Sequence, residues 1–221
     1  MNPERVSIAR IVSRPLQENT YIAWLTDRHD SIVVDPGLEP NLILNYLKQH
    51  NLDVAAILNT HGHGDHIGGN AVLKEAFPAA PLIIGELDAP MLTDSALNMS
   101  GMAGFHIVSP PADRTVRDGD KVECGGFVLD VRHIPGHSPG HVVFVWHDNS
   151  PVIVFGGDVL FAGSVGRTDL PRGSFDDLSG GIRDKLFTLP GDTIVLPGHG
   201  NATSVERERQ SNPFLGESVA N

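Results

Sequence analysis

Apolar residues fall in short runs along most of the chain, separated by clusters of glycine, proline and charged residues. Three runs near the start are rich in β-branched and aromatic side chains and predict strands at residues 6–12, 20–25 and 31–35. The spacing of apolar residues then changes, because Leu47 lies three residues after Leu44 and four after Ile43. These residues share one face of a helix expected over residues 39–50.

Strands and helices alternate unevenly through the rest of the chain. Further strands are expected at residues 54–60, 81–85, 120–124, 127–134, 141–146, 151–158 and 192–200. Helices are expected at residues 70–77, 174–189 and 204–210, and Ser174 caps the second with Asp177 three residues later. The strands cluster more than strict strand–helix–strand alternation allows. We therefore predict an α/β (α+β) fold of two sheets packed face to face with helices outside.

No linker, repeat or low-complexity segment divides the 221 residues, so residues 1–221 are expected to form one domain. Residues 95–111 show no clear period. This segment is either a lid over a pocket or a long connection packed by Met99, Met102 and Phe105. We favour the lid, because long irregular loops in compact domains are often functional.

Charge and composition argue against several classes of protein. The formal net charge is -11 and no run of Lys or Arg occurs, which argues against a nucleic-acid partner. No basic leader and no apolar run of ~18 residues occurs, so we expect a cytoplasmic protein without a membrane partner. Cys124 is the only cysteine, which excludes a disulfide within the chain and a site built from several thiolates.

Histidine and aspartate gather in the segment LNTHGHGDHIGGN, residues 58–70. His61, His63, Asp65 and His66 lie within six residues and are interleaved with glycines, which let the backbone approach closely. Neutral imidazole is the commonest metal ligand among side chains. The array can therefore serve two ions, with the first two histidines on one ion and Asp65 and His66 on the other. A solvated glycine-rich turn would explain one histidine but explains this cluster poorly.

Three later turns supply the ligands that two metal sites still need. His137 in IPGHSPGH, Asp158 in VIVFGGDVL and His199 in IVLPGHG each follow an apolar strand and a small turn residue. A carboxylate can bridge two ions, and Asp158 is the candidate for that role. Two ions about 3.5–4 Å apart activate water and stabilise an oxyanion, so hydrolysis needs no serine or cysteine nucleophile.

The segments THGHGDHIGG, PGHSPGH, FGGDVLF and LPGHG together resemble the metallo-β-lactamase superfamily. LQENTYI and VVDPG also resemble its opening strands, so the resemblance spans the whole chain. It implies a four-layer αβ/βα sandwich with the site at one edge between the sheets. We expect two zinc ions, because zinc is the default metal for His and Asp ligands, with iron or manganese as alternatives. By the same resemblance, Asp158 bridges a first ion held by His61, His63 and His137 and a second held by Asp65, His66 and His199.

The segments GSVGRTDLPRGSFDDL and LPGHGNATSVERERQSNPFL resemble short bacterial type II glyoxalases, the hydroxyacylglutathione hydrolases. This resemblance implies hydrolysis of S-D-lactoylglutathione to D-lactate and glutathione, with Asp65 and Asp158 as catalytic carboxylates. Superfamily members that hydrolyse antibiotics typically carry cysteine or serine where Asp158 stands, so a β-lactam substrate is not expected. Longer type II glyoxalases hold glutathione with an extra C-terminal region that this sequence lacks, which leaves the thiol carrier open.

Other functions within and beyond this superfamily remain alternatives. GRTD also resembles persulfide dioxygenases, whose single iron would be held by His61, His137 and Asp158. A nuclease of the same superfamily is a second alternative, against which the acidic charge weighs. A non-catalytic metal-binding protein is a third, against which the full ligand set weighs.

Further polar residues near these motifs have two interpretations each. Arg167 either binds a substrate carboxylate or forms an ion pair with Asp169, and we favour the ion pair. Asp35 is either an acceptor behind a metal ligand or a turn residue. His141 is expected in a strand or behind the ligands. The remaining histidines are expected at the surface or in the core: His29, His50, His106, His133 and His147.

Overall fold

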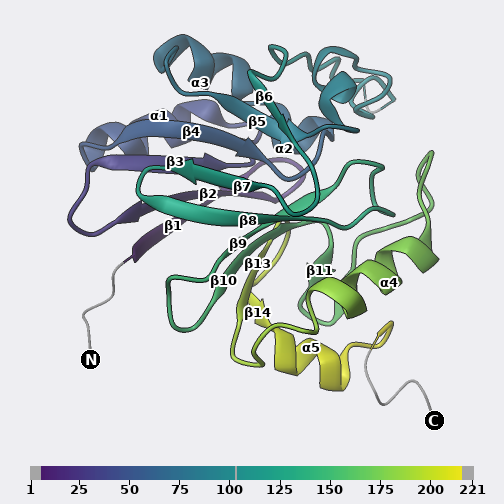
Figure 1. Cartoon of the computed structure of the whole chain (residues 1–221). Helices are drawn as coiled ribbons and strands as arrows, with labels where there is room; N and C mark the ends of the chain where they lie inside the picture. Colours follow the sequence, from purple (N-terminus) through teal and green to yellow (C-terminus); the bar gives the residue numbers. More distant parts are fainter. Residues whose placement is uncertain (1–5, 103, 216–221) are drawn as a thin grey trace.

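The computed structural model describes residues 6–102 and 104–215, and its strands form two sheets that lie face to face (Figure 1). The first sheet has six strands in chain order: β1 (Val6–Ser13), β2 (Glu18–Leu25), β3 (Asp30–Val34), β4 (Asp53–Asn59), β5 (Leu82–Gly85) and β6 (Arg114–Val116). Strands β1 to β3 are antiparallel, and β3 to β6 are parallel. The parallel part requires crossovers, which helices provide.

The second sheet has the order β14-β13-β10-β9-β8-β7. Its strands are β7 (Lys121–Cys124), β8 (Phe127–His133), β9 (Val142–Trp146), β10 (Ile153–Gly157), β13 (Ile194–Pro197) and β14 (Thr203–Ser204). A small two-stranded sheet of β11 (Leu160–Phe161) and β12 (Ser164–Val165) follows β10. β10 and β13 are parallel, and the chain crosses between them through α4 (Phe175–Lys185).

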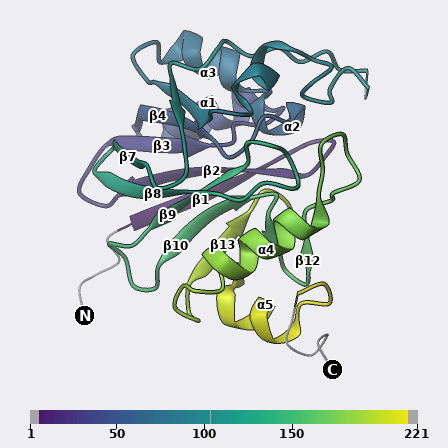
Figure 2. The same ribbon diagram turned by 45° about the vertical axis from the view of Figure 1, so that its right-hand side comes forward.

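Helices cover the outer face of each sheet, which makes four layers (Figures 1 and 2). Helices α1 (Pro40–Gln49) and α3 (Asn70–Ala76) pack on the first sheet, where Ile43, Leu47 and Leu73 join its buried outer residues. α4 and α5 (Val205–Ser211) pack on the second sheet through Leu178 and Val205 among others. The predicted α/β sandwich with helices outside is therefore confirmed.

The core between the sheets holds several large aromatic side chains. Phe127 and Trp146 meet edge to face with ring centroids 5.0 Å apart, and Tyr21 meets Phe155 at 6.1 Å. The Tyr21 hydroxyl donates a hydrogen bond of 2.9 Å to the carbonyl of Pro197, so it ties the first sheet to β13. Each such side chain contributes about 1.5–3 kcal/mol on burial. This core fixes the position of the two sheets relative to each other.

Most predicted elements are confirmed, with ends a few residues away. The Ser174 hydroxyl accepts a hydrogen bond from the amide of Asp177, as its capping role requires. The helix that begins there ends at Lys185 and not at residue 189, although Leu186 and Leu189 remain buried in the core. The sequence did not predict β6, β11, β12 and β14, because strands of two or three residues carry almost no periodic signal.

Residues 95–111 form a loop that follows the 3₁₀-helix η1 (Ala89–Thr93). The Asn98 amide donates to the carbonyls of Met91 and Ile107, and the Ser100 hydroxyl accepts from the amide of Ile107. Polar side chains thus organise this loop. The side chains of Met102 and Phe105 are exposed, so they do not pack this loop as the alternative expected, whereas Met99 is half-buried.

Among the described residues, none of the helices combines the length and the apolar composition needed to cross a bilayer.

Candidate metal centre

The seven predicted ligands lie on turns that follow strands of both sheets. His61 and His63 follow β4, and Asp65 and His66 lie in the short helix α2 (Gly64–Ile67). The others come from the second sheet: His137 lies between β8 and β9, Asp158 follows β10, and His199 follows β13. The structure brings all seven to one edge of the sandwich, because the two sheets place these strand ends opposite each other.

The first cluster consists of His61, His63 and His137, whose ring nitrogens converge. Nδ1 of His63 lies 3.0 Å from Nε2 of His61 and 2.9 Å from Nε2 of His137. All three residues are buried. Three imidazole nitrogens that face one another at this distance are typical of a site for a divalent transition-metal ion.

The second cluster consists of Asp65, His66 and His199. Oδ2 of Asp65 lies 3.4 Å from Nε2 of His199 and 3.8 Å from Nε2 of His66. The side chain of His66 is fully buried, whereas those of Asp65 and His199 are 17% and 28% exposed. This cluster is therefore looser and more open than the first.

Asp158 lies between the two clusters. Its Oδ2 is 3.5 Å from Nε2 of both His137 and His199, and its Oδ1 is 3.5 Å from Nε2 of His66. Oδ1 of Asp158 and Nε2 of His66 are buried and have no hydrogen-bond partner within the described residues. Buried polar groups without partners are rare, and these two atoms are both of kinds that bind metal ions. The donor set of imidazoles and carboxylates thus fits two divalent ions, with Asp158 placed to contact both.

Hydrogen bonds behind the ligands orient the histidine rings. Asp35 has a positive φ of 49°, and its Oδ2 accepts from Nδ1 of His66 at 3.1 Å and from the Thr60 hydroxyl at 2.7 Å. The Thr60 oxygen lies 3.1 Å from Nδ1 of His61, which donates to it. Nδ1 of His137 donates to the main-chain carbonyl of Arg167 at 2.9 Å. These bonds leave the opposite ring nitrogens as lone-pair donors, as metal ligands require.

Asp35 and His141 both act behind the ligands. The structure favours the first interpretation of Asp35, since it supports His66 directly. His141 lies just before β9, and its Nε2 accepts a hydrogen bond of 3.0 Å from the amide of Asp158. That bond fixes the turn carrying the Asp158 carboxylate.

Burial and charge shift the pKa values of the histidines in opposite directions. Burial lowers the pKa of His61 well below its ordinary value and that of His63 to about 3, and neighbouring histidines add to both effects. Burial would also lower the pKa of His66, but Asp158 and Asp65 raise it above the ordinary value. Burial therefore favours the neutral rings of His61 and His63, whereas the neighbouring carboxylates favour the protonated ring of His66.

A glycine turn allows the ligands of the second cluster to meet. A Cβ atom on Gly198 would lie 2.3 Å from Oδ1 of Asp158 and 2.5 Å from Cε1 of His66. No side chain fits in that space, so the glycine before His199 is required by the cage and not by the backbone conformation.

Arg167 forms the ion pair that the sequence favoured. Its guanidinium donates two hydrogen bonds of 2.7 and 2.8 Å to the Asp169 carboxylate, and both side chains are largely exposed. Its main-chain carbonyl holds His137, a contribution that no side-chain pattern predicts. Cys124 lies away from the centre, and burial raises its thiol pKa to about 12, which excludes a reactive thiolate at neutral pH.

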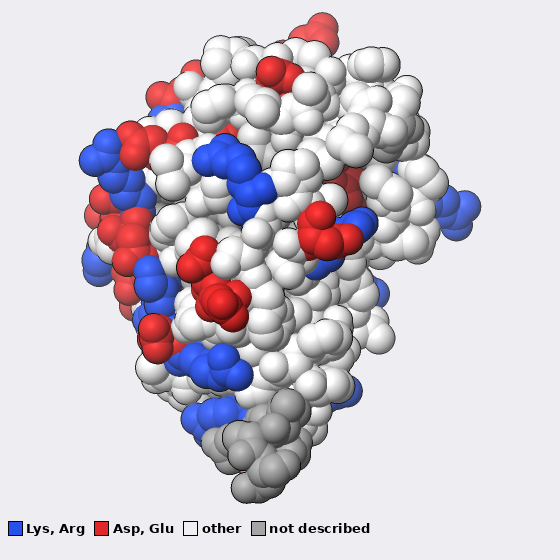
Figure 3. Space-filling model, turned by 90° about the vertical axis from the view of Figure 1, so that its right-hand side faces the viewer, with Lys and Arg blue, Asp and Glu red and all other residues white. Residues whose placement is uncertain are grey.

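The two clusters lie at the wall of a cleft of about 510 Å³. Its polar lining includes His63, Asp65, Asp158 and Arg167. The other lining side chains are largely apolar and come from loops around the centre: Leu16, Leu38, Met99, Met102, Phe105, Ile107 and Leu170. On the face of the molecule shown in Figure 3, acidic and basic side chains are interspersed and form no continuous basic patch. The cleft thus suits a small substrate with an apolar part.

The sequence analysis missed Asp88, which is fully buried beside the first cluster. Its carboxylate accepts hydrogen bonds from the loops that carry His61 and His137. Nothing in the surrounding segment GELDAP distinguishes this residue from an ordinary turn aspartate.

Comparison with known proteins identifies the class of protein that this fold and centre define. The family model of the metallo-β-lactamase superfamily matches residues 13–199. The chain is 40% identical over 202 residues to the probable metallo-hydrolase YqgX of Bacillus subtilis (strain 168), covering 91% of this chain and 93% of that protein. It is 36% identical to hydroxyacylglutathione hydrolase GloC of Haemophilus influenzae, covering 90% of this chain and 93% of that protein.

Solved structures agree with this assignment. BLEG-1 B3 metallo-beta-lactamase has a TM-score of 0.90 and 36% identity, covering 95% of this chain and 99% of that chain. TTHA1623 in a di-iron-bound form has a TM-score of 0.82 and 38% identity, covering 94% and 100%. The protein is a metal-binding hydrolase, and the chain belongs to the metallo-β-lactamase superfamily.

Proposed function

We propose that the protein uses two divalent ions to hydrolyse a small-molecule thioester, and that S-D-lactoylglutathione is the substrate. The carrying observation is the position of Asp158 between two clusters of ligands. The 36% identity to a hydroxyacylglutathione hydrolase supports the choice of substrate.

Two bound ions would lower the pKa of water and polarise the thioester carbonyl. Asp158 would hold both ions, and His61, His63 and His137 would hold the first while Asp65, His66 and His199 hold the second. Asp65 would also accept a hydrogen bond from the attacking water and so orient it toward the carbonyl carbon. The C–S bond then breaks, and the leaving sulfur takes a proton to give the thiol.

The cleft supports binding of both parts of a thioester. Leu16, Met102, Phe105 and Leu170 line it and would exclude water from the acyl group and the sulfur. Arg167 also lines the cleft, and its guanidinium would exchange Asp169 for a carboxylate of glutathione. The charge distribution does not favour a nucleic-acid substrate.

We propose zinc as the metal because imidazole and carboxylate ligands suit it. Iron is the second candidate, since the neighbour TTHA1623 was solved in a di-iron-bound form. Manganese is a third candidate for the same ligands.

The test is hydrolysis of S-D-lactoylglutathione by metal-free protein loaded separately with zinc, iron or manganese. We expect turnover with two ions per chain, loss of turnover in Asp158→Ala, and unchanged turnover in His29→Ala. His29 is an exposed histidine directly before β3, whereas Asp35, which supports a ligand, follows the other end of that strand. It therefore serves as the matched control. Two bound ions with no turnover would overturn the choice of substrate.

Two further substrates sharpen the result. A β-lactam is included because BLEG-1, at 36% identity, is named a B3 metallo-beta-lactamase. A persulfide with iron-loaded protein, followed by oxygen uptake, tests the dioxygenase alternative. If the protein turns over the β-lactam or the persulfide faster than S-D-lactoylglutathione, the proposed thioester hydrolysis is overturned.

A further inference from the structure

Asp88 is not among the expected ligands, but its carboxylate connects the two halves of the first cluster. Oδ2 accepts hydrogen bonds from the amide of Gly62 at 3.1 Å and from the Ser138 hydroxyl at 2.6 Å. Oδ1 accepts a hydrogen bond of 2.6 Å from the amide of Gly140. Gly62 lies between His61 and His63, and Ser138 directly follows His137. One buried side chain therefore holds both ligand loops.

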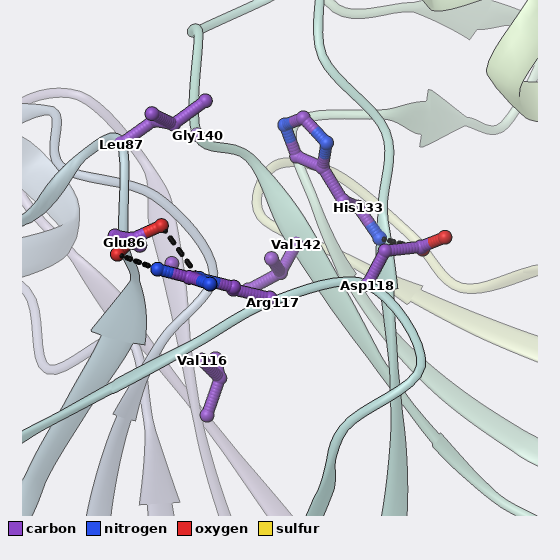
Figure 4. Close-up of a pocket in the computed structure, with 9 residues that line it drawn as sticks. Glu86, Leu87, Val116, Arg117, Asp118, His133, Gly140 and Val142 are labelled. Carbon is purple, nitrogen blue, oxygen red and sulfur yellow. Dashed lines mark hydrogen bonds and ion pairs between the residues drawn. The ribbon is translucent and has the colours of Figure 1, made fainter.

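The main chain around Asp88 also packs directly on the second loop. A Cβ atom on Gly140 would lie 2.3 Å from the amide nitrogen of Asp88, and one on Gly85 would lie 2.1 Å from the carbonyl oxygen of Gly140. Figure 4 shows a small pocket next to this contact, in which Leu87, the residue before Asp88, and Gly140 lie side by side. The turn that ends β5 thus meets the His137 loop without any intervening side chain.

This contact matters because the first cluster draws its ligands from different sheets. His61 and His63 follow β4 of the first sheet, whereas His137 lies between two strands of the second. Nδ1 of His63 lies 2.9 Å from Nε2 of His137, so a shift between the sheets would separate these nitrogens. A buried carboxylate with three donors resists such a shift, since each broken bond would leave a buried polar group unpaired.

We propose that Asp88 is a positioning residue that sets the separation of His63 and His137 and thereby the affinity of the first cluster for its ion. None of its hydrogen bonds reaches a residue of the second cluster. Its effect is therefore specific to one of the two ions. The inference depends on the metal centre and not on the identity of the thioester, and metal binding measures it without any substrate.

The test compares Asp88→Asn with Asp113→Asn. Asp113 is a suitable control because its Oδ2 likewise accepts a hydrogen bond from a main-chain amide, that of Leu82, and pairs with Lys74 rather than with a ligand loop. In Asp88→Asn, the side-chain NH₂ group would replace one acceptor oxygen and would face groups that themselves donate hydrogen bonds. We expect the first ion to bind about 10–100-fold more weakly, as for other groups that orient ligands, with the second unchanged. Competition titrations of the metal-free proteins give both affinities, and cobalt spectra identify the cluster concerned.

A second variant keeps the test decisive if Asp88→Asn does not fold. Ser138→Ala removes one of the three donors and changes no charge, so we expect a smaller loss of affinity for the same ion. Equal weakening of both ions in these two variants would assign Asp88 a general structural role and overturn the proposal. Unchanged affinity in Ser138→Ala, and in any folded Asp88→Asn protein, would overturn it as well.

Discussion

The two clusters of the metal centre differ in burial and in how closely their ligands converge. In the first, the facing ring nitrogens lie 2.9 and 3.0 Å apart and every residue is buried. In the second, Asp65 and His199 are partly exposed and the ligand atoms are 3.4 to 3.8 Å apart. Both clusters draw their ligands from loops of both sheets, but the side chains of the second are more open to the cleft.

The charges of the two clusters differ as well. Burial lowers the pKa of His61 and His63 and so favours their neutral rings, while nearby carboxylates raise the pKa of the buried His66 and of the partly exposed His199. Neutral rings accept an ion without losing a proton, whereas protonated rings must release one first. The comparison therefore indicates that the first cluster is closer to a preformed metal site, and that the second is the more exposed to water.

The largest expected effect comes from the residue that both clusters share. Replacing Asp158 by Ala removes the carboxylate between them, so we expect loss of both ions and a fall in kcat/KM of at least about 10³-fold, because metal catalysis contributes several kcal/mol. Metal analysis and kinetics measure the two losses. Two ions per chain with near-normal activity would contradict the bridging role.

Replacing one histidine in each cluster tests whether the clusters act separately. His63→Ala should weaken binding of the ion of the first cluster, whereas His199→Ala should leave one ion per chain and lower kcat by about 10²-fold. In His199→Ala the ion of the second cluster is lost, but the ion of the first cluster still provides part of the several kcal/mol by which metal ions stabilise the charge of the transition state. Ion content after dialysis against a weak chelator measures this difference. Identical ion content in the two variants would contradict the difference between clusters.

Smaller effects are expected from the residues behind the ligands. In Asp35→Asn, the acceptor for Nδ1 of His66 is altered, so affinity for the second ion should fall about 10–100-fold. Thr60→Val removes the hydroxyl beside Nδ1 of His61 and should weaken the first ion instead. Competition titration of both variants measures this pair of effects. The reverse assignment would show that these bonds do not control the ligands they touch.

The smallest effect is expected at Arg167. Alanine keeps the main-chain carbonyl that holds His137, and an exposed ion pair with Asp169 contributes little to stability. We expect unchanged ion content, kcat within about twofold, and a rise in KM of no more than about tenfold, since water screens the pair. Steady-state kinetics with S-D-lactoylglutathione measure both constants. A large fall in kcat would show that the side chain takes part in the reaction itself.

Much of the fold could be predicted because buried strands and amphipathic helices show characteristic spacings of hydrophobic residues. The run before His61 and the spacing of Ile43 and Leu47 both correspond to observed elements. The shortest strands could not be predicted from the sequence. The exposure of Met102 and Phe105 could not be predicted either, because an irregular loop has no regular spacing that shows which side chains face the core.

The sequence by itself determined the kinds of ligand and the places where they occur. Each candidate follows an apolar strand and a small turn residue, and that local pattern is complete within a few positions of His61, His137, Asp158 or His199. Local pattern also predicted the covering helices and the cap at Ser174. These features depend on neighbours along the chain, which sequence reasoning can read directly.

Only the tertiary structure decided how the ligands are grouped, oriented and exposed. The bond from Ser138 to Asp88 spans 50 residues, and that from Nδ1 of His137 to the Arg167 carbonyl spans 30. Asp35 meets His66 across 31 residues. Such contacts form when the two sheets pack through their shared apolar core, and no local pattern encodes which distant polar groups this packing brings together.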